Sequence, residues 1–313
     1  MITSIIRDHG GGLDAAIAEF GGDRTDWIDL STGINPVPYA IPEFSQNCWT
    51  ALPDKSASDA LTSAARKFWN VPDNATLLAA PGASSLIARI PTLFPATTVN
   101  IAGPTYNEHQ AAFRASDWQV LGGQADATVI VHPNNPDGQI YDEVQSGKRL
   151  TIIDESFCDI IPDQSLINLS TRPGTLVLKS FGKFWGLAGL RLGFAIGEPE
   201  LIAKLAETLG PWPVSGPALA IGAAALNDPN WASATRKRLT ADAARLDALM
   251  TSHGAKTVGG TSLFRLYHVD SAKDRQTHLA KSHIWTRIFP YSDNWLRLGL
   301  PAPHQWPQLE AAL

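Results

Sequence analysis

The stretch from Leu176 to Phe194, LVLKSFGKFWGLAGLRLGF, decides how the rest of this chain is interpreted. It begins with an apolar run that predicts a short buried strand, and this run ends at Ser180. A loop rich in glycine and aromatic residues then carries Lys183 and leads to Arg191. Lys183 is either an ordinary solvated lysine or an amine with a reaction to perform. The neighbouring hydroxyl and guanidinium groups, and glycines that let backbone approach a ligand closely, favour the second interpretation.

The composition excludes several classes of protein. The 313 residues are 44% hydrophobic and 18% charged, with a formal net charge of -5, and this favours one large domain with a smaller one. The mild acidity and the lack of a basic run argue against nucleic acid as a partner. We expect neither a signal peptide nor a membrane span, since no apolar run reaches about 18 residues. Cys48 and Cys158 form no metal-spaced cluster, and we expect reduced thiols in a cytoplasmic protein without a metal.

The order of the expected elements is typical of an α/β protein with a mainly parallel sheet covered by helices on both faces. We expect a large domain over residues 41–228 and a small α+β domain over residues 229–313, which the N-terminal segment 1–40 joins. A helix is expected from Ser58, as its N-cap, to Trp69, and only a short crossover helix fits between residues 138 and 150. Other expected strands lie at residues 76–79, 97–102, 118–121, 128–132, 150–153, 175–179, 263–268, 285–289 and 295–298, and other helices at 13–20, 84–93, 107–115, 199–209, 216–226 and 230–252.

Unusual polar residues follow the expected strands at their carboxyl ends, where ligands bind in open α/β sheets. A glycine turn that opens a helix offers backbone N–H groups to a phosphate, although a plain tight turn has the same sequence. An aromatic ring, an amide and a carboxylate follow three further strands, and each has an ordinary alternative as a packing, turn or capping residue. These residues are, in chain order, Gly82, Ala83, Ser84, Tyr106, Asn135 and Asp154.

Taken together with Lys183, these groups are what pyridoxal phosphate requires. A lysine binds the cofactor covalently, a carboxylate keeps its pyridine nitrogen protonated, and the cationic ring then accepts electrons from the Cα of an amino acid. A charge-assisted hydrogen bond of this kind contributes about 1.5–3 kcal/mol, enough to hold the pyridinium form near neutral pH. The sequence therefore predicts a cofactor-dependent enzyme.

The order of three motifs resembles the aspartate-aminotransferase-fold (fold type I) family of pyridoxal-phosphate enzymes. The motifs are NNPxG at 134–138, DExF at 154–157 and SxxKxxGLAGLRxG at 180–193, and the resemblance covers almost the whole chain. It implies a large domain with a mainly parallel sheet between helices, a small α+β domain, and a homodimer. It also implies that Lys183 binds the cofactor, that Asp154 and Asn135 contact its ring nitrogen and ring oxygen, and that Tyr106 stacks on the ring. The implied phosphate ligands are Gly82, Ala83, Ser84, Ser180 and Arg191, and the implied substrate-carboxylate ligand is Arg297.

Within this fold, the N-terminal HGGG, the LSTGINP segment at 30–36 and PWPVSGP at 211–217 resemble the threonine-phosphate decarboxylases of cobalamin biosynthesis. That resemblance implies that His9, Asn35 and Arg287 hold a substrate phosphate, a role for which a guanidinium is well suited. His9 as a tail residue and Asn35 as a turn former remain the ordinary alternatives. The sequence departs from the family at Phe157 and Leu52, where relatives carry tyrosines that contact the cofactor, the second from a neighbouring subunit.

Three functions follow as hypotheses. The first is decarboxylation of L-threonine O-3-phosphate to (R)-1-aminopropan-2-ol phosphate, in which Lys183 returns a proton to Cα. The second is a histidinol-phosphate-type aminotransferase, in which Lys183 shuttles the Cα proton. The third is a non-catalytic cofactor-binding regulator, against which the intact Lys183 argues. Only the HGG and PWPVSGPA segments favour the decarboxylase over the aminotransferase.

Overall fold

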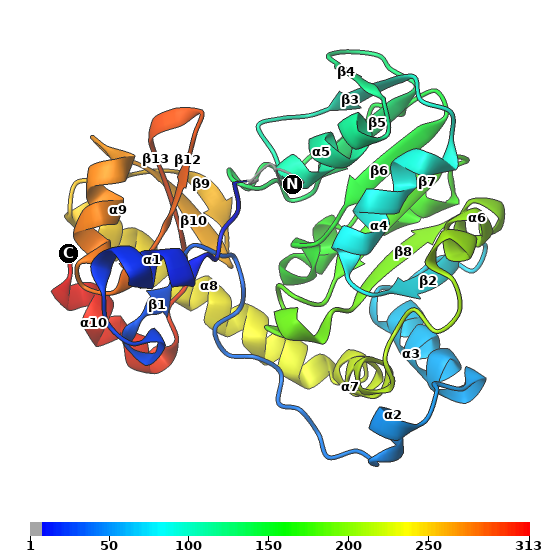
Figure 1. The fold of residues 1–313 in the computed structure, drawn as a ribbon, viewed down its shortest axis with the longest axis horizontal. Coiled ribbons are helices and arrows are strands. Elements are labelled where there is room, and N and C mark those ends of the chain that lie inside the picture. The colour runs from blue at the N-terminus through cyan, green and yellow to red at the C-terminus, as the bar shows by residue number, and fades with distance from the viewer. Residues whose placement is uncertain (1–7) are drawn as a thin grey trace. The chain divides into compact units, whose positions relative to one another are not determined.

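The computed structural model describes residues 8–313 (Figure 1). The chain divides into a large unit, Pro38–Arg236, and a small unit formed by the chain up to Val37 together with Lys237–Leu313. The second boundary lies eight residues beyond the expected one at 228/229 and falls inside helix α8 (Pro229–Ser252). The first turns of α8 belong to the large unit because Trp231 stacks on Trp185, with ring centroids 5.2 Å apart.

A seven-stranded sheet forms the centre of the large unit, with the strand order β2-β8-β7-β6-β5-β3-β4. β8 runs antiparallel to both of its neighbours, and the pairs from β7 to β4 are parallel. The predicted mainly parallel sheet is therefore confirmed. The strands are β2 (Thr76–Ala80), β3 (Thr98–Ile101), β4 (Gln119–Leu121), β5 (Ala127–Val131), β6 (Leu150–Asp154), β7 (Thr175–Ser180) and β8 (Gly193–Gly197).

Helices cover both faces of this sheet (Figure 1). On one face, Leu86, Phe113 and Leu205 from three helices pack into a core with the buried strand residues. These three helices are α4 (Ala83–Arg89), α5 (Asn107–Ala115) and α6 (Pro199–Leu209). A Cβ placed on Gly222 would lie within 3 Å of the Leu61 and Leu192 side chains. This glycine therefore lets its own helix pack closely against the helix that carries Leu61 and against the segment that carries Leu192. The remaining helices of the large unit are α2 (Asn47–Thr50), α3 (Lys55–Phe68) and α7 (Gly216–Leu226).

Two local predictions in the large unit are wrong. The helix expected from Ser58 begins at Lys55, and its N-cap is Asp54, whose side chain accepts a hydrogen bond from the Ala57 N–H at 3.0 Å. Ser58 instead donates its hydroxyl to the Asp54 carbonyl. No helix forms between Gly138 and Leu150, where a short one was expected. The chain there returns to the sheet through Gly147, whose Cβ would lie 2.2 Å from the Leu150 carbonyl oxygen.

The small unit joins both ends of the described chain. β1 (Ile28–Asp29) pairs in parallel with β11 (Ile284–Trp285), and Leu13 and Ala16 of α1 (Leu13–Phe20) pack with Trp27 and Ala280. An antiparallel sheet has the order β12-β13-β10-β9. Its strands are β9 (Lys256–Thr261), β10 (Phe264–His268), β12 (Arg287–Phe289) and β13 (Ser292–Gly299), and two further helices are α9 (Ala272–Ala280) and α10 (Trp306–Ala311). Across residues 8–313, no helix has the length and apolarity that a membrane crossing requires.

Candidate active site

The register of the large sheet brings the predicted cofactor residues to one edge. Ala80 at the end of β2 is paired with Gly193, and Gly193 is paired with Ser180 at the end of β7. The turn that follows Ala80 therefore starts beside Ser180. Asp154, the last residue of β6, is paired with Val131, the last residue of β5. The strand ends thus place the turn, hydroxyl and carboxylate on the same side of the sheet.

The first group at this edge is suited to an anion. Gly82 lies at the start of α4 with a φ of 85°, and a Cβ at this position would lie 2.5 Å from Nη2 of Arg191. The positive φ favours glycine here, and the absence of a side chain leaves room for the guanidinium beside the turn. Arg191 Nη2 donates to Ser84 Oγ at 3.0 Å. A guanidinium, a hydroxyl and the first backbone N–H groups of a helix thus meet, and such a set binds a phosphate well.

The loop that carries Lys183 is anchored by its own buried aromatic side chains. Phe181, Phe184 and Trp185 are fully buried, and the Trp185 ring stacks on Phe181 with centroids 5.0 Å apart. The Trp185 indole N–H donates to Asp159 Oδ2 at 3.1 Å, which fixes the loop to the segment after β6. Lys183 itself is half-buried, and its Nζ lies 5.4 Å from the centre of the Phe157 ring. The Lys183 amine is therefore partly withdrawn from solvent and lies beside an aromatic ring.

Asp154 is buried, 2% exposed, and remains a carboxylate. Burial alone would raise the pKa of this carboxyl, but hydrogen bonds from His109 and Ser156 and the charge of His109 outweigh burial and lower the pKa. His109 Nε2 lies 2.8 Å from Oδ2, and the Ser156 N–H and hydroxyl both donate to Oδ1. An ionised, rigidly held carboxylate at this edge is suited to holding a protonated ring nitrogen.

Asn135 and Tyr106 lie on two loops that Asn134 joins. The Asn134 amide donates to the Pro104 carbonyl at 3.0 Å, and its oxygen accepts from the Thr105 hydroxyl at 2.6 Å. These bonds link the loop after β5 to the loop after β3. Tyr106 and Asn135 are both half-buried, and the edge of the Tyr106 ring meets the His109 ring at a centroid distance of 6.2 Å.

Sequence reasoning missed His109, Ser156 and Asn134. The first of these had a readable signal, because His109 follows Tyr106 by one helical turn and is a buried histidine on a helix with a polar sequence. Ser156 and Asn134 lie inside motifs already recognised, yet only the structure shows that they hold Asp154 and the two loops.

A buried network of charged side chains lies next to the ends of β6 and β7. Lys179 Nζ is 2.5 Å from Glu155 and 3.7 Å from Asp159. Burial opposes protonation of Lys179, but the two carboxylates outweigh it and raise the pKa of its amine. Asp159 also accepts the indole N–H groups of Trp69 and Trp185. Because Glu155 follows Asp154 directly, this network fixes the strand end that carries the site.

His132, Glu155 and Cys158 come within 4.8 Å of one another, yet their bonding does not suit a metal. His132 Nε2 is 2.7 Å from the Gln164 carbonyl, and its Nδ1 accepts from the Tyr141 N–H at 3.2 Å. Burial, reinforced by Glu155, strongly raises the pKa of the Cys158 thiol, so the thiolate that a metal needs is disfavoured.

The predicted substrate residues all lie in the small unit. Arg287 of β12 and Arg297 of β13 are directly opposite each other in the antiparallel ladder. Arg297 is buried and donates to the Ser31 carbonyl at 2.7 Å. Burial and the charge of Arg287 lower the pKa of Arg297 to about 10, so it remains protonated at neutral pH. Like charges in opposite positions of a ladder repel, and this pair is therefore suited to binding an anion with more than one negative charge.

The N-terminal HGGG segment packs against the STGIN segment. A Cβ at Gly10 would lie 2.4 Å from the Ser31 carbonyl oxygen, and the Gly11 N–H donates to Ser31 Oγ at 2.7 Å. The carbonyl of His9, whose side chain is exposed, accepts from Arg287 at 2.6 Å. Two of the three segments that carry the decarboxylase resemblance, HGGG and LSTGINP, are therefore in contact with each other.

Asn35 is buried, and its side-chain oxygen has partners within the small unit. It accepts from the Val37 N–H at 3.0 Å and from Nη2 of Arg238 at 2.5 Å. The first bond closes the turn expected of an asparagine before a proline. A contact between Asn35 and a substrate phosphate stays a prediction.

Comparison with known proteins places these observations in a family. Residues 25–313 match the model of the family described as aminotransferase class I and II. The chain belongs to this family. Among curated relatives, a threonine-phosphate decarboxylase from Sinorhizobium sp is 39% identical, covering 93% of this chain and 92% of the relative. The threonine-phosphate decarboxylase from Pseudomonas aeruginosa is 37% identical, covering 98% and 97%.

The fold is shared with a solved structure that contains a cofactor. The histidinol-phosphate aminotransferase from Sinorhizobium meliloti, in complex with pyridoxal-5'-phosphate, has a TM-score of 0.82 at 16% identity, covering 97% of this chain and 93% of that one. At this identity the likeness shows the fold alone. The fold type I architecture predicted from the sequence is confirmed.

The groups in the large unit fit such a cofactor. The close approach of Arg191 to the Gly82 turn forms an anion cradle, and Asp154 supplies an ionised carboxylate. Lys183 is a half-buried amine on a rigid loop at the same end of β7. Phosphate, ring nitrogen and aldehyde each have a matching partner among these residues.

Proposed function

We propose that this protein is a pyridoxal-phosphate-dependent decarboxylase that converts L-threonine O-3-phosphate to (R)-1-aminopropan-2-ol phosphate, a step of cobalamin biosynthesis. Two relatives with this activity in their names align with nearly all of the chain at 37–39% identity. The proposed cofactor ligands are the residues of the large unit described above, with Lys183 as the covalent attachment.

The alignment with these two relatives carries the proposal, and the arginine pair of the small unit fits the same substrate. Arg287 and Arg297 are opposite each other in the β12–β13 ladder, and their guanidinium carbons lie 5.3 and 5.9 Å from the centre of the same ring, that of Phe289. Threonine phosphate carries a carboxylate and a phosphate on one short skeleton. Histidinol phosphate carries only the phosphate. A substrate with two anionic groups, such as threonine phosphate, neutralises both arginines. The glutamate that an aminotransferase uses also carries two carboxylates, so the choice of decarboxylation rests on the two named relatives.

The residues divide the chemistry between them. When bound, the cofactor withdraws electrons from the bonds at the substrate Cα. We assign Arg297 to the carboxylate and Arg287 to the phosphate, so that the substrate is held at both ends. Asp154 keeps its negative charge and favours a protonated ring nitrogen. Lys183 Nζ returns a proton to Cα after carbon dioxide leaves.

The test compares two products of one incubation. Protein loaded with pyridoxal phosphate is incubated with threonine phosphate, with and without 2-oxoglutarate. Decarboxylation predicts carbon dioxide in both samples and no keto acid derived from the substrate. Keto acid that forms only with 2-oxoglutarate, without carbon dioxide, would contradict the proposal and favour the aminotransferase.

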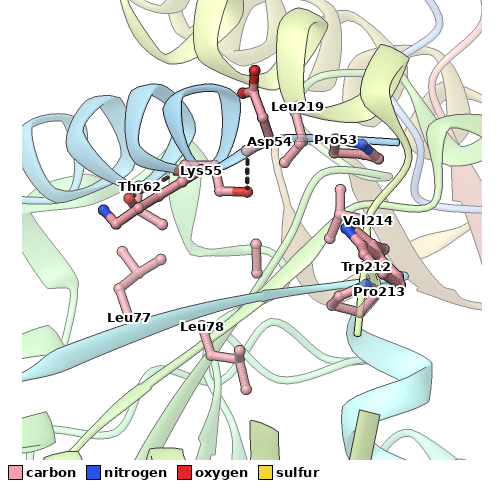
Figure 2. Close-up of a pocket in the computed structure, with 12 residues that line it drawn as sticks. Pro53, Asp54, Lys55, Thr62, Leu77, Leu78, Trp212, Pro213, Val214 and Leu219 are labelled. Atoms are coloured by element: carbon pink, nitrogen blue, oxygen red, sulfur yellow. Dashed lines mark hydrogen bonds between the residues drawn. The ribbon is translucent and has the colours of Figure 1, made fainter. Parts of the chain in front are cut away.

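We also propose that the protein is a cytoplasmic homodimer. Four large apolar side chains of the large unit are 57–70% exposed: Ile41, Trp49, Leu52 and Trp212. Next to Leu52 and Trp212 lies a mainly apolar cavity of about 370 Å³, between Leu77 and Leu78 of the edge strand β2, Pro53–Lys55, and Trp212–Val214 (Figure 2). None of the proposed cofactor ligands lines it.

An apolar surface of this kind is typical of a contact with another chain, and we assign it to a second copy. Sedimentation of wild type and of a Trp49→Lys variant tests this assignment. The wild type should sediment as a dimer. The variant dimer should be weaker, so monomers should be seen at protein concentrations at which the wild type is still dimeric. A monomeric wild type would contradict the assignment.

A further inference from the structure

The guanidinium of Arg287 already holds a carboxylate from its own chain. Both of its terminal nitrogens bind Asp8, Nη1 to Oδ1 and Nη2 to Oδ2, each at 2.6 Å. Nη1 also donates to the His9 carbonyl at 2.6 Å. This paired geometry is the one in which a guanidinium binds a carboxylate or two oxygens of a phosphate. The position that a substrate phosphate would need is therefore occupied by Asp8.

The two partners of this ion pair differ in how firmly they are held. The Arg287 side chain is 12% exposed, belongs to strand β12 and lies 5.3 Å from the centre of the Phe289 ring. The Asp8 side chain is 46% exposed, and Asp8 belongs to neither a helix nor a strand. The carboxylate is thus on the solvent side of the guanidinium, and it can leave without a rearrangement of Arg287.

The chain next to Asp8 provides a short tether that is anchored at Gly11. The Gly11 N–H is held by Ser31 Oγ at 2.7 Å, and the Gly11 carbonyl accepts the Trp285 indole N–H at 3.1 Å. Gly11 has a φ of 87°, and a Cβ there would have open space around it. A tether of this length keeps the carboxylate at a high effective concentration near Arg287 after it dissociates.

We propose that Asp8 is a built-in competitor for Arg287, which a phosphate monoester displaces when it binds. The inference rests on the proposed function, since it takes Arg287 as the phosphate ligand. A dianion has the advantage over Asp8 because it meets Arg287 with two negative charges and lies near a second guanidinium, that of Arg297. The tethered carboxylate lowers the apparent affinity of every anion that needs the same guanidinium. Weakly bound anions are thereby kept out at ordinary concentrations, and Arg287 has a partner when no substrate is bound.

Inorganic phosphate is the probe, and calorimetric titration of the protein loaded with pyridoxal phosphate is the measurement. Asp8→Asn removes the negative charge and keeps the size of the side chain. We expect it to bind phosphate about fivefold more tightly, or more, than wild type. Asp14→Asn is the matched control, because Asp14 also pairs with an arginine, Arg24, from the N-terminal part of the chain. Its phosphate affinity should equal that of wild type.

A second measurement follows the segment itself. Hydrogen exchange of the His9 and Gly10 amides should rise when phosphate is added to wild type and should already be high in Asp8→Asn, while the Gly11 amide, held by Ser31, should exchange at an unchanged rate. Unchanged or weaker phosphate binding by Asp8→Asn would overturn the proposal, as would slower exchange on phosphate addition, because Asp8 would then support the anion site. The carbon dioxide assay is independent of both measurements. Tighter phosphate binding without decarboxylation would leave this inference intact and would reject the proposed function.

Discussion

The large and small units hold their functional groups in different ways. In the large unit, Asp154 is fixed by His109 and Ser156, and the Lys183 loop rests on buried aromatic rings. In the small unit, Arg287 is paired with Asp8, and Asn35 with Arg238. The first arrangement is preorganised for a cofactor that stays bound. The second consists of contacts within the chain, and under the proposals above a substrate would replace the Arg287–Asp8 pair when it binds.

The largest effect is expected from Lys183→Ala. The amine is the proposed covalent attachment and the proton donor, so we expect kcat to fall by at least about 10³-fold. The visible absorbance of the lysine-bound cofactor should disappear as well. Folding should be unaffected, which the far-UV circular dichroism checks. A variant that keeps the absorbance band would show that another amine holds the cofactor.

Asp154→Asn comes next and removes charge from the large unit with little change in shape. We expect kcat to fall by about a hundredfold, because an amide no longer favours the protonated ring nitrogen. In wild type the pKa of Asp154 lies below that of an ordinary carboxyl group. Asp154 is therefore ionised at neutral pH, and its negative charge is lost only when the pH falls through that lowered pKa.

The cofactor spectrum of the wild type should therefore not show a titration of Asp154 between about pH 5 and 8. A titration in that interval that Asp154→Asn abolishes would contradict the assignment of the carboxylate.

A smaller effect is expected from Asn35→Ala in the small unit. The substitution leaves the Val37 N–H and Arg238 without their shared acceptor, and we expect a loss of about 1–3 kcal/mol in the free energy of unfolding. Urea denaturation measures it. Asn227→Ala is the control, since this exposed side chain makes one bond to a helix carbonyl, and its effect should stay within about 0.5 kcal/mol. A rise in KM without a loss of stability would show that Asn35 acts mainly on the substrate.

The sequence predicts the large unit well because its signals are local. The motif around Lys183 lies within one stretch, and helices α5, α6 and α7 have the expected ends, since α5 and α6 have an apolar periodicity and α7 is a continuous apolar run. The N-cap was misplaced because Asp54 and Ser58 are both good caps, and only the geometry of the turn decides between them. In the small unit, strand β9, KTVGGT, is not predicted because it has no apolar run.

The small unit is harder to predict because its contacts join distant parts of the chain. Asp8 and Arg287 are 279 positions apart, and Ser31 and Arg297 are 266 apart. A single sequence gives no indication that these residues meet. The same holds for His109 and Asp154, whose contact depends on how α5 packs against the end of β6. The family resemblance predicts Arg287 and Arg297 as substrate ligands, but only the structure shows that Asp8 binds Arg287.

The division of labour between the two units is tested most directly by one pair of variants, Arg191→Lys and Arg287→Lys, measured side by side. Lysine keeps the charge and loses the paired hydrogen bonds. We predict that Arg191→Lys raises the dissociation constant of pyridoxal phosphate about tenfold, while the KM for threonine phosphate at saturating cofactor stays within about twofold. Arg287→Lys should raise that KM about tenfold and leave cofactor binding unchanged. Equal losses of cofactor and substrate affinity in both variants would contradict the account.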